Sequence, residues 1–107
     1  MTEIKYHKDV LLFFDELFDI LIEKGYFSYY EYSAQYIDNL IDYVKKNITI
    51  KPHKPAPPYF SKYGKNLFFI NYNSNKKTTW YIFFEKSDNL FFIRYITNNH
   101  FEGHFFV

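Results

Sequence analysis

The stretch NLFFINYNSNKKTTWYIFFEKSDNLFFIRYITN, residues 66–98, decides the fold. It contains three runs rich in Phe, Tyr, Ile and Thr, at residues 66–73, 78–86 and 90–98. Such side chains favour extended strands, and the intervening SNKK and SDN have the composition of tight turns. Because both connections are short, the sequence predicts three strands paired as an antiparallel meander. The runs are apolar on both faces, so a face that nothing covers would be a partner site.

The chain before this stretch predicts a short strand at residues 3–7 and then two helices. Gly25 is expected to end the first helix, and Ser28 with Glu31 forms a capping box that starts the second. The short connection predicts an antiparallel helix hairpin. The apolar positions with helical spacing are Val10, Phe13, Phe14, Leu17, Phe18, Leu21 and Ile22 in the first helix, and Ser33, Ile37, Leu40, Ile41, Val44 and Ile48 in the second.

All four prolines lie in KPHKPAPP, residues 51–58. Proline is excluded from helix interiors and central strands, so this segment is expected to be an extended connector on the surface. The predicted fold is therefore α+β: a short N-terminal strand, an antiparallel helix hairpin, and a three-stranded antiparallel meander forming one sheet. A chain of 107 residues is long enough for one domain, residues 1–107.

Composition excludes several classes of protein. There is no cysteine, which rules out disulfides and thiolate metal sites and fits a reducing cytoplasm. We find neither a signal peptide nor a membrane-spanning stretch, and expect a cytoplasmic protein without a membrane partner. Residues 1–50 have five Lys against nine acidic residues, whereas residues 51–107 have seven Lys and Arg94 against three. The basic half is a candidate for binding a polyanion.

The only arginine, Arg94, lies inside an apolar strand, on the face of Phe92 and Ile96 if the strand alternates strictly. A guanidinium cannot be buried alone. It either forms an ion pair, for instance with Glu85 on the neighbouring strand, or binds phosphate among aromatic rings that stack on bases. The residues alone leave both interpretations open.

Motifs for other chemistry are absent. His100 and His104 have helical spacing, but no further ligand pattern accompanies them, so no metal is expected. There is no G-x-S-x-G nucleophile motif and no phosphate-binding glycine loop, and no cofactor is expected.

The layout as a whole resembles the RelE/ParE superfamily, the toxins of bacterial type II toxin–antitoxin systems. The resemblance covers nearly the whole chain. It depends on the order of elements and on the pieces "YGKN" at residues 63–66, "TTWYIFFEK" at 78–86 and "IRYITNNH" at 93–100.

This resemblance implies a toxin that a cognate antitoxin neutralises, in a toxin–antitoxin hetero-oligomer. RelE-like members cleave mRNA, usually on the ribosome, without metal or cofactor, and this is the first expectation. ParE-like members inhibit DNA gyrase without catalysis, which is the alternative. A further alternative is a non-toxic protein-interaction domain.

For RNA cleavage, the candidate catalytic residues are Arg94, Tyr95 and His100. Arg94 would hold the phosphate, and His100 has an ordinary pKa near neutrality, as a general acid or base requires. The candidate nucleic-acid-binding residues are Lys62, Lys65, Lys76 and Lys77 in the basic half.

Overall fold

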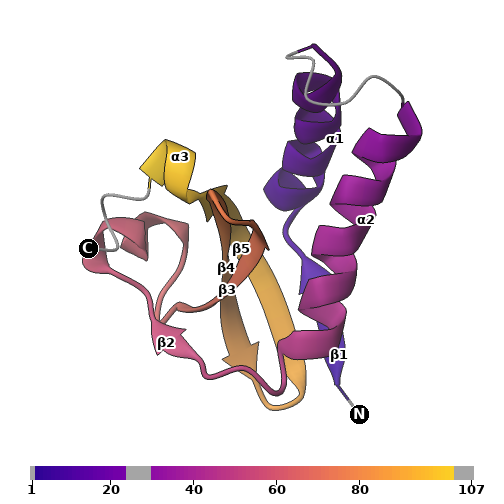
Figure 1. Ribbon diagram of the computed structural model, residues 1–107. Helices are drawn as coiled ribbons and strands as arrows, with labels where there is room; N and C mark the ends of the chain where they lie inside the picture. Colours follow the sequence, from indigo (N-terminus) through magenta and orange to yellow (C-terminus); the bar gives the residue numbers. More distant parts are fainter. Residues whose placement is uncertain (1, 24–29, 103–107) are drawn as a thin grey trace.

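The computed structural model describes residues 2–23 and 30–102 and confirms an α+β fold. Two helices pack on one face of a single sheet (Figure 1). The sheet has five strands in the order β1-β5-β4-β3-β2. The strands are β1 Glu3–Tyr6, β2 Lys54–Pro55, β3 Phe68–Asn75, β4 Thr78–Ser87 and β5 Leu90–Asn98.

The predicted sheet of three antiparallel strands is wrong, because the sheet is larger and mixed. β4 does pair antiparallel with both β3 and β5, but β2 adds to the outer side of β3. β1 pairs in parallel with β5, from Glu3 opposite Leu90 to Tyr6 opposite Ile93. At the two ends of this pairing, the Glu3 N–H donates to the Asn89 carbonyl at 2.8 Å and the His7 N–H donates to the Ile93 carbonyl at 2.9 Å.

The helix hairpin agrees with the periodicity of the sequence. The helices are α1 Lys8–Glu23 and α2 Tyr30–Asn47, and they lie antiparallel (Figure 1). The predicted helix stop at Gly25 and cap at Ser28 lie outside the described residues. None of the helices in the described part of the chain is long and apolar enough to cross a membrane. The buried side chains in or just after the helices are Val10, Phe14, Leu17 and Leu21, and Ser33, Ile37, Leu40, Val44 and Ile48.

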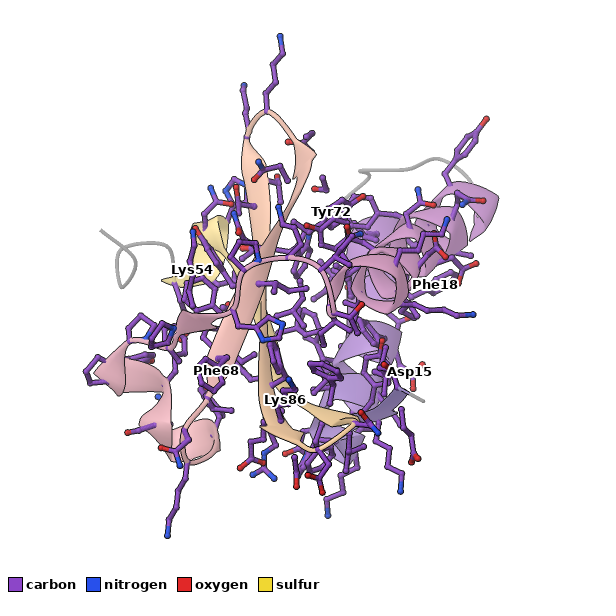
Figure 2. All side chains as sticks on the ribbon, turned by 90° about the horizontal axis from the view of Figure 1, so that it is seen from below. Asp15, Phe18, Lys54, Phe68, Tyr72 and Lys86 are labelled. Carbon is purple, nitrogen blue, oxygen red and sulfur yellow. The ribbon has the colours of Figure 1, made fainter. Side chains whose placement is uncertain are left out.

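Trp80 of β4 lies at the centre of the core between the helices and the sheet, where only 2% of it is exposed. Its indole N–H donates to the Tyr36 hydroxyl of α2 at 2.9 Å, which satisfies the one polar group of the side chain. Farther along α2, the Tyr43 ring stacks on Tyr72 with centroids 4.3 Å apart. Figure 2 shows Tyr72 and Phe18 on this helix side of the sheet. These contacts hold α2 across β3 and β4.

The second face of the sheet is covered by the chain itself. After β2, the short 3-10 helix η1, Pro58–Tyr63, lies against the side of the sheet that is opposite the helix hairpin (Figure 1). Phe60 of η1 has no exposed surface and stacks on Phe83 of β4, with ring centroids 4.5 Å apart. Phe60 thus belongs to a second, smaller core, against which Ala56 of the proline-rich connector packs. The second face of the sheet is therefore not left uncovered for a partner at this place.

We predict that Phe60→Ala lowers the free energy of unfolding by about 3–5 kcal/mol, because it leaves a cavity between η1 and the sheet. Ile50→Ala is the matched control, since Ile50 is 73% exposed, and its effect should stay within about 0.5 kcal/mol. Urea unfolding monitored by circular dichroism measures both values. Equal effects of the two substitutions would show that η1 does not cover the sheet in solution.

Candidate functional site

A cleft of about 620 Å³ opens along the final part of β5. Because β1 ends opposite Ile93, residues 94–98 of β5 have no neighbouring strand on that side in the described part of the chain. The start of α1, the helix η1 and the short helix α3, Asn99–Glu102, surround this edge. We call it the tyrosine cleft; its lining residues are Asp9, Val10, Phe13, Glu16, Tyr59, Tyr63, Arg94, Tyr95, Ile96, Thr97, Phe101 and Glu102.

A β-bulge in β5 brings Arg94 and Tyr95 to the same face of the sheet. On β4, Phe83 pairs with Tyr95 and the next residue, Phe84, pairs with Ile93, so Arg94 is the extra residue. The predicted alternation therefore holds for Phe92, whose ring centroid lies 5.2 Å from Arg94 Cζ. It fails for Ile96, which joins the core on the helix side.

The structure shows Arg94 in an ion pair. Its Nε–H donates to the Tyr63 carbonyl at 2.8 Å, and its Nη1 lies 3.6 Å from Glu85 Oε1. The Gly64 backbone passes close to this pair, since a Cβ there would lie 3.4 Å from the Glu85 carboxylate and 3.2 Å from Leu67 Cδ2. The Arg94 and Glu85 side chains are 28% and 35% exposed, so the guanidinium is only partly screened by water. Arg94 thus fastens η1 to β4 and β5.

Tyr95 is held on both its ring and its hydroxyl. The ring stacks on Tyr63 with centroids 3.8 Å apart and planes 7° apart, and the hydroxyl donates to the Glu102 carboxylate of α3. Burial, and then the hydrogen bond to Glu102, raise the pKa of Tyr95 well above its ordinary value. The phenol stays protonated at neutral pH, so it can donate a hydrogen bond but cannot serve as a general base.

Charges at the cleft are mostly negative. Asp9, Glu16 and Glu102 contribute carboxylates, and Arg94 is the one cation in the lining. Lys62 stands at the rim, with its ammonium 4.0 Å from the Tyr59 ring centroid and 5.4 Å from that of Tyr63. The hydrogen bond with Tyr59 raises the pKa of Lys62, which keeps it charged.

The predicted lysine patch is not gathered at this cleft. Lys65 lines a different cleft, together with Glu85 and Lys86. Lys76 and Lys77 form the turn between β3 and β4, and both are exposed. Of the four predicted nucleic-acid-binding lysines, the structure brings only Lys62 next to Arg94 and Tyr95.

His100 does not line the tyrosine cleft. Its Nε2 lies 3.0 Å from the Thr78 hydroxyl of β4, and it lines a separate cleft of about 440 Å³ beside Trp80 and Leu17. The α3 backbone is capped by Asn98, whose side-chain oxygen accepts from the His100 and Phe101 N–H groups at 2.9 and 3.1 Å. The predicted pairing of His100 with Arg94 as acid or base and phosphate ligand is therefore not seen. His104 lies outside the described residues, among which no group of His, Asp and Glu could hold a metal ion.

Several cleft residues were missed from the sequence alone. Tyr63 and Glu102 line the cleft, although the sequence pattern marks neither as a site residue. Thr97 is 1% exposed and lines the cleft, and its hydroxyl has no hydrogen-bond partner among the described residues. Strict alternation along β5 would place Thr97 on the face opposite Arg94, but the bulge, which has no signal in the sequence, brings both to one face.

Comparison of the chain with protein-family models, curated proteins and solved structures gave no match. The residues of the cleft are therefore interpreted through their own geometry. Aromatic walls, carboxylates at the rim and one engaged cation suit a positively charged ligand better than a phosphate.

The raised pKa of Tyr95 predicts a loss of stability in alkali. The folded state keeps the Tyr95 proton at a pH where the unfolded chain, with an ordinary pKa of 10.0, has released it. The free energy of unfolding is thus unaffected by this group below pH 10.0 and falls above it, by about 1.4 kcal/mol per pH unit.

Urea unfolding of the wild type and of Tyr95→Phe between neutral pH and the alkaline range measures this difference. We expect the wild type to lose stability more steeply above pH 10.0, and the two curves to run parallel below it. Parallel curves throughout would mean that Tyr95 is not buried against Glu102.

Proposed function

We propose that this protein is a toxin of the RelE/ParE kind that arrests growth by binding a protein target, and that a cognate antitoxin neutralises it. Support comes from the order of elements. β1, α1 and α2 precede β3, β4 and β5 along the chain, and all of these strands belong to one sheet. Of the sequence pieces behind the resemblance, "YGKN" begins at the last residue of η1, "TTWYIFFEK" lies in β4, and "IRYITNNH" runs from β5 into α3.

The single observation that favours binding over RNA cleavage is the state of Arg94. Its guanidinium is engaged by Glu85 and the Tyr63 carbonyl, and carboxylates line the cleft around it. A phosphodiester entering the cleft would meet Asp9, Glu16 and Glu102, which repel it. His100, the proposed proton-transfer group, faces another cleft.

The cleft is suited to a cationic side chain of a target protein. A Lys or Arg of the target would pair with the carboxylate of Glu16 or Asp9, and it would have to displace Lys62 to contact the Tyr59 ring. DNA gyrase is the target that the ParE-like resemblance implies. The antitoxin would then cover the same cleft, in which Phe101 is 54% exposed.

RNA cleavage stays the second candidate, because Arg94 and Tyr95 lie on one face and Lys62 stands beside them. In that mechanism, Arg94 would leave Glu85 to stabilise charge on the phosphate, and Tyr95 would donate a proton. The two candidates predict opposite roles for a carboxylate in the tyrosine cleft: it would attract a cationic side chain of a target protein but repel a phosphate of RNA.

We predict that induction of the protein alone arrests bacterial growth, and that transcripts keep their normal 5′ ends. Co-expression of an antitoxin gene from beside its own gene should restore growth. Mapping RNA 5′ ends after induction checks this. New ends that appear with the arrest would favour cleavage, and normal growth with abundant folded protein would contradict the toxin proposal itself.

Glu16→Lys separates the two mechanisms further. If the cleft binds a cationic side chain, this substitution should relieve the growth arrest, because the new lysine repels the positive charge of the target. RNA cleavage predicts an unchanged or stronger arrest, because the substitution removes repulsion of phosphate. Asp15→Lys is the matched control: Asp15 is exposed on α1 but does not line the cleft, so the arrest should persist.

A further inference from the structure

The outer edge of β1 is open. β1 is the last strand of the sheet on its side, and β5 is its only neighbour among the described strands. Its residues alternate between exposed and half-buried, with Glu3 and Lys5 exposed and Ile4 and Tyr6 half-buried. An open edge offers unpaired N–H and carbonyl groups to another strand.

The hydrogen bonds to β5 show which backbone groups face outward. The N–H groups of Glu3 and His7 both donate to β5, at 2.8 and 2.9 Å. The backbone N–H and carbonyl groups of successive residues in a strand point to opposite edges. Those of Ile4 and Tyr6 therefore point to the outer edge, and by the same alternation so do those of Thr2.

We propose that β1 pairs antiparallel with β1 of a second copy of this chain, about a two-fold axis at Ile4. In this register, the outward N–H and carbonyl of each Ile4 meet those of the other Ile4. Thr2 of each copy meets Tyr6 of the other in the same way. Every outward group of the strand then finds a partner, and the two sheets join into one.

The charges of β1 select this register. When Ile4 lies opposite Ile4, Glu3 of each copy lies opposite Lys5 of the other, in the pairs where side chains approach most closely. Within one copy, Glu3 and Lys5 already lie together, with Lys5 Nζ 3.3 Å from Glu3 Oε1. The dimer would therefore join two ion pairs into an alternating group of four charges. The same patch meets itself, as a two-fold interface requires.

The other face of β1 contributes apolar contacts. Ile4 and Tyr6 point to the helix side and, with Ile41 and Thr49, line a groove of about 510 Å³ beside α2. In the proposed dimer the two Ile4 side chains lie across the axis from one another. Each copy thereby extends the apolar wall of the other copy's groove.

Lys5 has a competing explanation, since lysines on edge strands prevent sheets from joining. That explanation predicts that removal of the lysine increases association. The dimer proposal predicts the opposite, because Lys5 pairs with Glu3 of the other copy.

The test is sedimentation equilibrium of the purified chain over a wide range of concentration. We expect a reversible monomer–dimer equilibrium for the wild type. Glu3→Lys and Lys5→Glu should each weaken the dimer at least about tenfold, because each places like charges opposite each other twice. Both positions are exposed, so the melting temperature should change little.

An equal mixture of the two variants is the decisive sample. In a heterodimer of Glu3→Lys with Lys5→Glu, both cross-strand pairs are attractive again, so native mass spectrometry should show heterodimers and few homodimers. A statistical distribution, in which the heterodimer is only about twice as abundant as each homodimer, would overturn the register. A wild type that stays monomeric at every concentration, or a Lys5→Ala variant that associates more strongly, would overturn the interface.

Proline substitutions test the backbone part of the proposal. Thr2→Pro removes an outward N–H and should weaken the dimer without lowering the melting temperature. Glu3→Pro is the matched control, because it removes the N–H that donates to Asn89 and should destabilise the monomer itself. An unchanged dimerisation constant in Thr2→Pro would contradict pairing through this edge.

Discussion

The contact of Arg94 with Glu85 and the Tyr63 carbonyl is the constraint on which the second face of the sheet depends. The bulge places Arg94 and Tyr95 on one face, and Arg94 then holds the end of η1 where the Tyr63 ring can stack on Tyr95. That stack carries the Tyr95 hydroxyl to Glu102 and so positions α3. Of the elements that bound the tyrosine cleft, η1 and β5 are the ones that Arg94 joins directly.

These contacts explain why the only arginine of the chain lies in an apolar strand: Arg94 has structural partners there. A cation that already has a carboxylate and a carbonyl as partners contributes little to binding a phosphate unless those contacts break. The apolar second face, meanwhile, is closed by Phe60, so it is not the surface a partner would cover. The tyrosine cleft and the outer edge of β1 are two surfaces that the described residues leave accessible, and their different chemistry suits different ligands.

The sequence predicted those parts of the fold that have a local signal. The 3.6-residue pattern of α1 and α2 and the turns at residues 74–77 and 87–89 located both helices and the strands β3, β4 and β5. The parallel pairing of β1 with β5 was not predicted, because it joins residues some ninety positions apart and no local pattern encodes it. At the site, the pairing of Arg94 with Glu85 was one of two interpretations from the sequence. His100 was expected beside Arg94, but the α3 turn directs it to the Thr78 hydroxyl and to another cleft. Phe60 lies just beyond the proline-rich segment 51–58, and nothing in its local pattern indicates that it is buried.

The most direct test of this account is a double-mutant cycle on Arg94 and Glu85, measured as free energies of unfolding. If Arg94 is a structural clamp, Arg94→Ala lowers stability by about 1–3 kcal/mol, because it leaves the half-buried Glu85 without a partner. Glu85→Ala also destabilises, and the double variant costs less than the sum, with a coupling of about 0.5–1 kcal/mol or more. If Arg94→Ala and Glu85→Ala instead leave stability unchanged while Arg94→Ala abolishes growth arrest, Arg94 acts on a ligand, and the clamp on which this account rests does not exist.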